Sequence, residues 1–430
     1  MNTEQILALG AWEAARRLQS RQLSAQRFVE AGLERIASRE PQVQAFAHLD
    51  AQAALARART LDAGPLTGPL HGLTVGVKDV FDTVDMPTQG GSRAFQGHQA
   101  GQDAACVALL RQAGAIVLGK TVTTELATFP TQGTRNPLNL AHTPGGSSSG
   151  SAAAVADRMV PFATATQTLG STIRPAGYCG VAGYKPSYNL LPRRGVWPNA
   201  DSLDTVGLMA CDVRDVAFLA SVVAIHPGLM PSHEAPTQPP AIGLCRSHEW
   251  ERADPAMQAA FDACGSRLAA AGARVTTLAL PPHFAGLLHA HGTVAWYELA
   301  RGFADIVGRL GDQIHPELRK RTLAGLAITP EAYQQAQALA RRCRQELPNV
   351  MGGCDVLFTP AATGEAPHGL GSSGDTAMNQ VWTFLHGPCV SVTGGHGLQG
   401  LPLAMQVVGR LDDDARTLVA ARWIEQALLT

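Results

Sequence analysis

The sequence predicts an α/β protein whose sheet is covered by helices. Residues 73–81 and 115–120 are mostly apolar, as buried strands are, and the segment 103–115 between them has helical periodicity. A strand, helix, strand order of this length implies a parallel crossover connection. The 430 residues, of which 45% are hydrophobic and 16% are charged, suit one large core of this class.

The rest of the chain is assigned by the same reasoning. Apolar residues recur at helical spacing near the start of the chain, so residues 1–65 are expected to wrap the core as helices. Residues 66–430 are expected to form the core, with 1–430 as a single domain. The proline-rich segment 226–240 is interpreted as a surface connection, with a domain boundary as the alternative. Further strands are expected at residues 241–245, 355–360, 389–395 and 401–409, and helices at 254–271 and from 413 onward.

Composition argues against several classes of protein. The 34 basic and 35 acidic residues nearly cancel and form no basic run, so a nucleic-acid partner is not expected. The start of the chain lacks a signal-peptide pattern, and no stretch reaches the roughly 18 apolar residues of a membrane span. The eight cysteines form no CxxC pair, which favours reduced thiols in the cytoplasm. Because Cys and His lack ligand spacing, neither a metal nor another cofactor is expected.

The most distinctive segment is the loop at residues 143–156, TPGGSSSGSAAAVA, whose glycines and serines lead into an alanine-rich predicted helix. Such a loop can hold an anion at the helix N-terminus or form a flexible turn. The phosphate-loop pattern GxxxxGK[ST] is absent. The density of Gly, Pro, Ser and Thr across residues 130–200 favours loops folded around a site.

Ser171 follows Gly170 in the segment 165–180, ATQTLGSTIRPAGYCG. A serine at a turn after an apolar strand can expose its hydroxyl while successive backbone N–H groups point to one spot, as an oxyanion hole requires. The segment is not a GxSxG nucleophile elbow. A turn serine without a chemical role is the alternative.

A nucleophilic serine needs a base, and Lys78 is the candidate. It lies within the first apolar predicted strand, where burial lowers the pKa of a lysine from about 10.4 so that the neutral amine can accept a proton. A salt bridge with Asp79 or Asp82 is the alternative. None of the 14 histidines lies in a segment typical of a catalytic triad, and His71 and His142 are interpreted as turn or supporting residues.

Together these segments resemble the amidase signature family of serine hydrolases. Lys78 in GVKD, Ser147 in GGSSSG and Ser171 in TQTLGSTIRPA match the lysine, the cis-serine and the nucleophilic serine of that family. The similarity extends from about residue 20 through LLRQAGAIVLGKT, YCGVAGYKPS, SLDTVG, DVLFTP and GLPLAMQVVG. It implies a large, mixed, mostly parallel twisted sheet with helices on both faces.

The resemblance also implies a mechanism. Ser171 attacks the amide carbonyl while Ser147 passes the proton to neutral Lys78, and water then hydrolyses the acyl-enzyme. The residues implied to support this reaction are the oxyanion-hole N–H groups of Thr168, Leu169, Gly170 and Ser171, and the hydroxyl of Ser148.

The segment TQTLGSTIR departs from the common TDTGGSIR of the family. Gln167 replaces an aspartate, Leu169 replaces a glycine, and the arginine is displaced to Arg174. Because that aspartate and arginine are natural ion-pair partners, this indicates one coordinated change beside the oxyanion hole. Substrate-pocket residues are expected at Met86, Thr88, Asn379, Trp382 and Thr383.

The predicted function is hydrolysis of a non-peptide carboxamide to a carboxylate and an amine or ammonia. One alternative is the glutaminase subunit of a tRNA-dependent amidotransferase, which is ranked lower because no charged pocket for glutamine is evident. A catalytically inactive binding protein on the same fold is a further alternative, and the intact Lys78, Ser147 and Ser171 argue against it. The expected partner is a small-molecule amide, without nucleic acid or membrane, and the chain is expected to be a monomer or homodimer.

Overall fold

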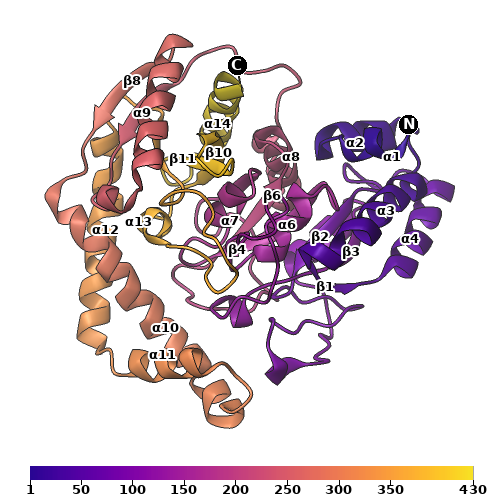
Figure 1. The fold of residues 1–430 in the computed structure, drawn as a ribbon, viewed down its shortest axis with the longest axis horizontal. Coiled ribbons are helices and arrows are strands. Elements are labelled where there is room, and N and C mark those ends of the chain that lie inside the picture. Colours follow the sequence, from indigo (N-terminus) through magenta and orange to yellow (C-terminus); the bar gives the residue numbers. More distant parts are fainter. Residues whose placement is uncertain (430) are drawn as a thin grey trace.

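The computed structural model describes residues 1–429 and contains one sheet of eleven strands in the order β1-β3-β2-β4-β6-β5-β10-β11-β9-β7-β8 (Figure 1). The central strands are buried along their whole length, so helices or loops cover both faces of the sheet. The strands are β1 (Phe46–Leu49), β2 (Thr74–Lys78), β3 (Ile116–Thr121), β4 (Phe162–Gln167), β5 (Ala182–Lys185), β6 (Thr205–Ala210), β7 (Ala241–Cys245), β8 (Arg274–Leu278), β9 (Val356–Pro360), β10 (Cys389–His396) and β11 (Pro402–Val408).

The α/β class and the mixed sheet are confirmed. The predicted sheet is mostly parallel, whereas most neighbouring strands of the observed sheet are antiparallel. Parallel pairing joins β2 to β3 and β4, and β7 to β8 and β9. The remaining six of the ten neighbouring pairs are antiparallel, and most of them lie in the centre of the sheet. The difference arises because β10 and β11 form a hairpin and β5 and β6 are inserted antiparallel between the two parallel ends.

The N-terminal region is helical as predicted and lies at one side of the molecule (Figure 1). One strand, β1, interrupts the helices and pairs antiparallel with β3 at the edge of the sheet. Residues 226–240 connect α8 to β7, and β7 lies in the same sheet as the preceding strand β6. The N-terminal helices are α1 (Thr3–Leu7), α2 (Ala11–Gln19), α3 (Ala25–Val43) and α4 (Ala51–Ala63).

Further helices pack directly against the sheet. Helix α6 contacts β4, α7 contacts β10 and β11, and α8 contacts β6. The predicted crossover between β2 and β3 is formed by α5. The helices of this part of the chain are α5 (Ala105–Gln112), α6 (Ser149–Ala156), α7 (Ile173–Tyr178), α8 (Val213–Val223), α9 (Pro255–Ala270), α13 (Ala377–Phe384) and α14 (Asp414–Leu429), of which α5 packs against α8 and α13 against α10.

Three helices form an arm that extends away from the sheet (Figure 1). They are α10 (Leu287–Leu310), α11 (Pro316–Leu326) and α12 (Pro330–Met351), and α10 packs against both of the others and against α13. Proline at the first position of α11 and α12 presets the backbone for a helix start, and the Thr329 hydroxyl accepts a hydrogen bond from Ala332 N–H. Within residues 1–429 no helix is both long and apolar enough to cross a bilayer.

Candidate active site

Lys78 is the last residue of β2 and is fully buried. Its ammonium nitrogen Nζ donates hydrogen bonds to Ser147 Oγ at 2.8 Å and to Thr166 Oγ1 at 2.6 Å. Its backbone N–H donates to Thr164 Oγ1 at 3.0 Å. Because Thr164 and Thr166 lie two residues apart on the neighbouring strand β4, their side chains share one face of the sheet and hold both ends of the lysine.

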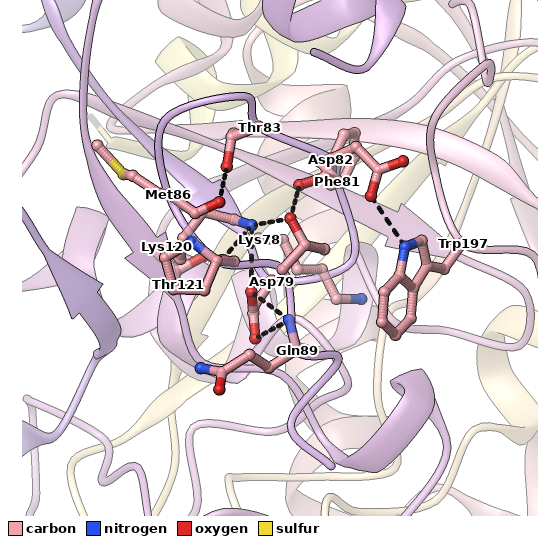
Figure 2. A network of polar contacts seen from close by, with 12 residues as sticks. Lys78, Asp79, Phe81, Asp82, Thr83, Met86, Gln89, Lys120, Thr121 and Trp197 are labelled. Carbon is pink, nitrogen blue, oxygen red and sulfur yellow. Dashed lines mark hydrogen bonds and ion pairs between the residues drawn. The ribbon is translucent and has the colours of Figure 1, made fainter. Parts of the chain in front are cut away.

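No salt bridge joins Lys78 to either neighbouring aspartate. Asp79 forms a buried ion pair with Lys120 at 3.1 Å, and Trp197 Nε1 donates to Asp82 at 3.0 Å (Figure 2). The polar contacts of Lys78 Nζ among the described residues are the hydroxyls of Ser147 and Thr166, and none is a carboxylate. Burial lowers the pKa of Lys78 to about 7, and the more distant charge of Asp204 opposes this shift.

Ser147 lies in the glycine-rich loop that leads into α6, as the sequence predicts. A cis peptide bond joins Gly146 to Ser147. Gly145 has a φ of 82°, and a Cβ atom there would lie 2.9 Å from Pro175 Cα, so this position requires glycine. The Ser148 hydroxyl lies 3.4 Å from the backbone of Thr166, the residue whose own hydroxyl contacts Lys78.

Ser171 lies between β4 and α7 and is 9% exposed. It lines a cavity of about 360 Å³ that Ser147 also lines. The fold brings these two serines to one cavity because α6, which follows Ser147, packs against β4 and α7, the two elements on either side of Ser171. The structure therefore places Lys78, Ser147 and Ser171 in one region, with Lys78 behind Ser147.

The loop before Ser171 is held by its carbonyl groups. In a trans peptide the C=O and the following N–H point in opposite directions, so a bonded carbonyl fixes where that N–H points. The N–H groups of Leu169, Gly170 and Ser171 donate to no other described residue. Thr168 O accepts from His291 Nε2 at 2.9 Å, and Gly170 O accepts from Arg174 N at 3.1 Å. Leu169 O lies 3.3 Å from Thr383 Oγ1, whose one proton is shared with Asn379 O at 3.1 Å.

His291, on α10, is a residue that the sequence did not reveal, because no motif surrounds it. It is fully buried, and this burial lowers its pKa to about 4, so its imidazole is neutral near pH 7. Because Nε2 donates to Thr168 O, Nδ1 is the acceptor for Gln380 Nε2 at 3.0 Å. His71 and His142, by contrast, hydrogen-bond to Thr67 and Ala366 and are not among the residues lining the cavity.

Gln167 explains part of the altered segment. Its side-chain carbonyl accepts the N–H groups of Thr172 and Ile173 at 2.9 and 3.0 Å, and its amide donates to Thr383 Oγ1 at 2.9 Å. Gln167 therefore satisfies orphan N–H groups at the start of α7 without a negative charge. Beside it, the Thr168 hydroxyl donates to the carboxylate of Asp204 at 2.5 Å.

The five predicted pocket residues lie outside the wall of this cavity. Asn379 and Thr383, on α13, lie behind the loop that precedes Ser171: a Cβ on Gly170 would approach the Asn379 amide at 2.5 Å. Met86, Thr88 and Trp382 are buried away from the lining residues. The wall comes instead from the helical arm and two loops, including Phe129, Trp296, Leu299, Arg321 and Ser373.

Comparison with known proteins gives consistent matches across the chain. Residues 27–418 match the family Amidase. The chain is 33% identical, over 92% of each protein, to a subunit of the glutamyl-tRNA(Gln) amidotransferase of Chloroflexus aggregans. A crystal structure of an amidase is similar with a TM-score of 0.89, 30% identity and coverage of 97% of this chain and 99% of that chain. The peptide amidase of Stenotrophomonas maltophilia is similar with a TM-score of 0.83, 28% identity and coverage of 97% and 96%.

One prediction from the sequence is wrong in the light of these relatives. The sequence predicted a small-molecule amide as the sole partner, no nucleic acid, and a monomer or homodimer. These expectations do not fit relatives that are subunits of a tRNA amidotransferase. The balanced charge is a poor guide here, because one subunit of an assembly need not itself carry the basic surface that attracts nucleic acid. The family match and the identity of at least 30% over more than nine-tenths of the chain agree with the motifs around Lys78, Ser147 and Ser171. The chain belongs to the amidase signature family.

Proposed function

We propose that this chain hydrolyses a carboxamide through an acyl-enzyme formed on Ser171. The observation that carries the proposal is the hydrogen bond from buried Lys78 to Ser147, which lines the same cavity as Ser171. A lysine without a counter-charge and with a pKa of about 7 is partly neutral at physiological pH and can act as a base.

In the proposed relay, Ser171 Oγ attacks the carbonyl carbon, its proton moves to Ser147 Oγ, and the proton of Ser147 moves to Lys78 Nζ. Collapse of the tetrahedral intermediate breaks the C–N bond, and the same relay returns the proton to the departing nitrogen. Water then adds to the ester carbonyl and releases the carboxylate, which restores Ser171. Thr166 keeps the Lys78 amine aimed at Ser147 through its second hydrogen bond.

We propose that the N–H groups of Leu169, Gly170 and Ser171 stabilise the oxyanion of the intermediate. Support comes from their lack of partners in the described chain and from the bonds that fix the preceding carbonyls. Donors fixed before the reaction need no reorganisation as charge develops, which is why such sites accelerate acyl transfer.

Different observations support two alternative substrates for this reaction. Similarity to the glutamyl-tRNA(Gln) amidotransferase subunits favours glutamine as the amide, with the chain as one component of an assembly that acts on a tRNA. Similarity to the solved amidase favours hydrolysis of another amide. The cavity wall, which includes Arg174 and Arg321 but no Asp or Glu of the described chain, offers no counter-charge for the ammonium group of glutamine and supports the second setting.

The experiment combines a substrate panel with labelling of the nucleophile. Purified wild-type chain is assayed for ammonia release from glutamine and from aliphatic and aryl amides, and is then treated with a fluorophosphonate and analysed by mass spectrometry. The adduct is expected on Ser171 and absent in Ser171→Ala. Ser147→Ala is expected to acylate slowly, whereas Ser149→Ala serves as the control because its hydroxyl contacts Val122 O instead. An adduct on Ser147 or Ser148 contradicts the proposed roles.

A further inference from the structure

Arg174 occupies an unusual position in the cavity that Ser171 lines. It lies in the first turn of α7, three residues after Ser171, and is 2% exposed. Its guanidinium nitrogen Nη2 donates to Gly146 O at 2.6 Å and to Ser373 Oγ at 3.1 Å. The other two nitrogens, Nε and Nη1, are buried without a hydrogen-bond partner in the described chain. A guanidinium in this state lacks most of the partners that its five N–H donors require.

No acidic side chain of the described residues pairs with this guanidinium. The carboxylate whose charge acts on it is Asp375, which is exposed, forms an ion pair with Arg252 at 3.2 Å and accepts the N–H of Ala377. Gln167, at the position where the common family pattern has an aspartate, is neutral and bonds to the start of α7. Because an unpaired buried charge is strongly destabilising, the missing counter-charge points to a ligand.

The surroundings of Arg174 favour an anion over a neutral group. Arg321 also lines the cavity, where it stacks over the rings of Phe129 and Trp296 and adds a second positive charge. Ser373, which caps Nη2, belongs to the loop 371–374 that is partly exposed and has no regular structure. An incoming oxygen can therefore replace the Ser373 hydroxyl without disturbing a helix or strand.

We infer that Arg174 binds a carboxylate carried by the acyl part of the amide substrate, an inference that rests on the proposed amide hydrolysis. Arginine matches a carboxylate with two parallel N–H to oxygen bonds, a geometry that also orients the ligand. The cavity of about 360 Å³ suits a small molecule, so the substrate class is a short amide with a carboxylate at the far end of its acyl chain. Both a monoamide of a dicarboxylic acid and glutamine carry such a group.

The first test compares an acidic amide with its neutral counterpart. Wild type is assayed with succinamate, butyramide and glutamine, and kcat/KM for succinamate is expected to exceed that for butyramide by about 10- to 100-fold, as expected for a charge-assisted hydrogen bond. In Arg174→Met this ratio is expected to fall towards one, and Arg174→Lys is expected to recover part of it. Arg252→Met, which removes an arginine near the same loop but outside the cavity, is expected to keep the wild-type ratio.

A second measurement does not require turnover or a folded Arg174 variant. Calorimetric titration of Ser171→Ala with succinamate and butyramide is expected to show at least 10-fold tighter binding of succinamate. A glutamine arm separates the two carboxylate sources, since tighter binding of glutamine than of succinamate identifies an amino acid as the ligand. Equal binding of succinamate and butyramide overturns the inference, even if both amides are hydrolysed. Absence of hydrolysis of every amide, with selective binding of succinamate retained, instead counts against the proposed function and leaves the carboxylate site standing.

Discussion

Lys78 Nζ lies 2.8 Å from Ser147 Oγ at a fully buried position where no described carboxylate pairs with the lysine. Burial lowers the pKa of Lys78 from 10.5 to about 7. Between pH 7 and pH 10.5 Lys78 keeps its proton in the unfolded chain but has lost it in the folded chain. The free energy of unfolding therefore rises with pH in this window, and the buried lysine destabilises the fold most at and below pH 7.

Lys78→Met is expected to remove this pH dependence. The difference in unfolding free energy between wild type and variant should change by about 1.4 kcal/mol per pH unit between pH 7 and 10, the contribution of one proton. Urea denaturation at several pH values measures it. Lys320→Met, at an exposed lysine, is the control and should track wild type. A difference that stays constant with pH is evidence against a lowered pKa.

His291 is expected to act as a positioning residue through the carbonyl of Thr168. His291→Ala removes the donor that fixes the peptide between Thr168 and Leu169, so kcat should fall by about 10-fold while KM changes less, as expected for one hydrogen bond. His291→Gln keeps an amide donor and should restore part of the rate. The control is His71→Ala, at a buried histidine distant from the loop. A loss confined to KM would show that His291 contributes to substrate binding instead.

The buried pair of Asp79 and Lys120 is expected to be important for stability (Figure 2). Asp79→Asn leaves the Lys120 ammonium group buried without a counter-charge, which should lower the free energy of unfolding by about 3 to 5 kcal/mol. Combining it with Lys120→Met removes that charge and should restore much of the loss. Urea denaturation measures both. The exposed ion pair of Asp305 and Arg309 provides the control, since Asp305→Asn should be nearly neutral. If Asp79→Asn lowers the free energy of unfolding as little as Asp305→Asn does, the prediction is wrong and another group or water stabilises the Lys120 charge.

Local signals in the sequence predicted seven of the eleven strands and the positions of Lys78, Ser147 and Ser171, but not β1, β5, β6 or β8. A lysine at the end of an apolar run, a Gly and Ser loop before an alanine-rich helix, and a lone serine after a strand each show in a few consecutive residues. The positions of β2, α6 and β4 match these signals closely. What brings Lys78 and Ser147 together is the packing of α6, which follows Ser147, against β2 and β4, and no local pattern specifies this contact.

The missed features depend on contacts between segments distant in the sequence. Whether β5 and β6 pair antiparallel in the middle of the sheet depends on neighbours that no local pattern specifies. The helical arm carries start signals, such as Thr329 followed by Pro330, yet nothing local indicates that α10 brings His291 to the loop at Thr168. Thr383 contacts that loop at Leu169 O, and Asn379 lies behind Gly170. Packing decides which face of α13 meets the loop, and no local pattern indicates it.

The most direct test of the relay is the pH dependence of kcat/KM from pH 6 to 10 for wild type and Lys78→Arg. The relay needs the neutral amine, so the rate should rise through about pH 7 and stay high at alkaline pH. Lys78→Arg should be nearly inactive throughout, because a guanidinium keeps its proton in this range, whereas His71→Ala and His142→Ala should keep the wild-type profile. A Lys78→Arg enzyme that retains most of its rate, or a histidine variant that loses both activity and the acid limb, would contradict the relay.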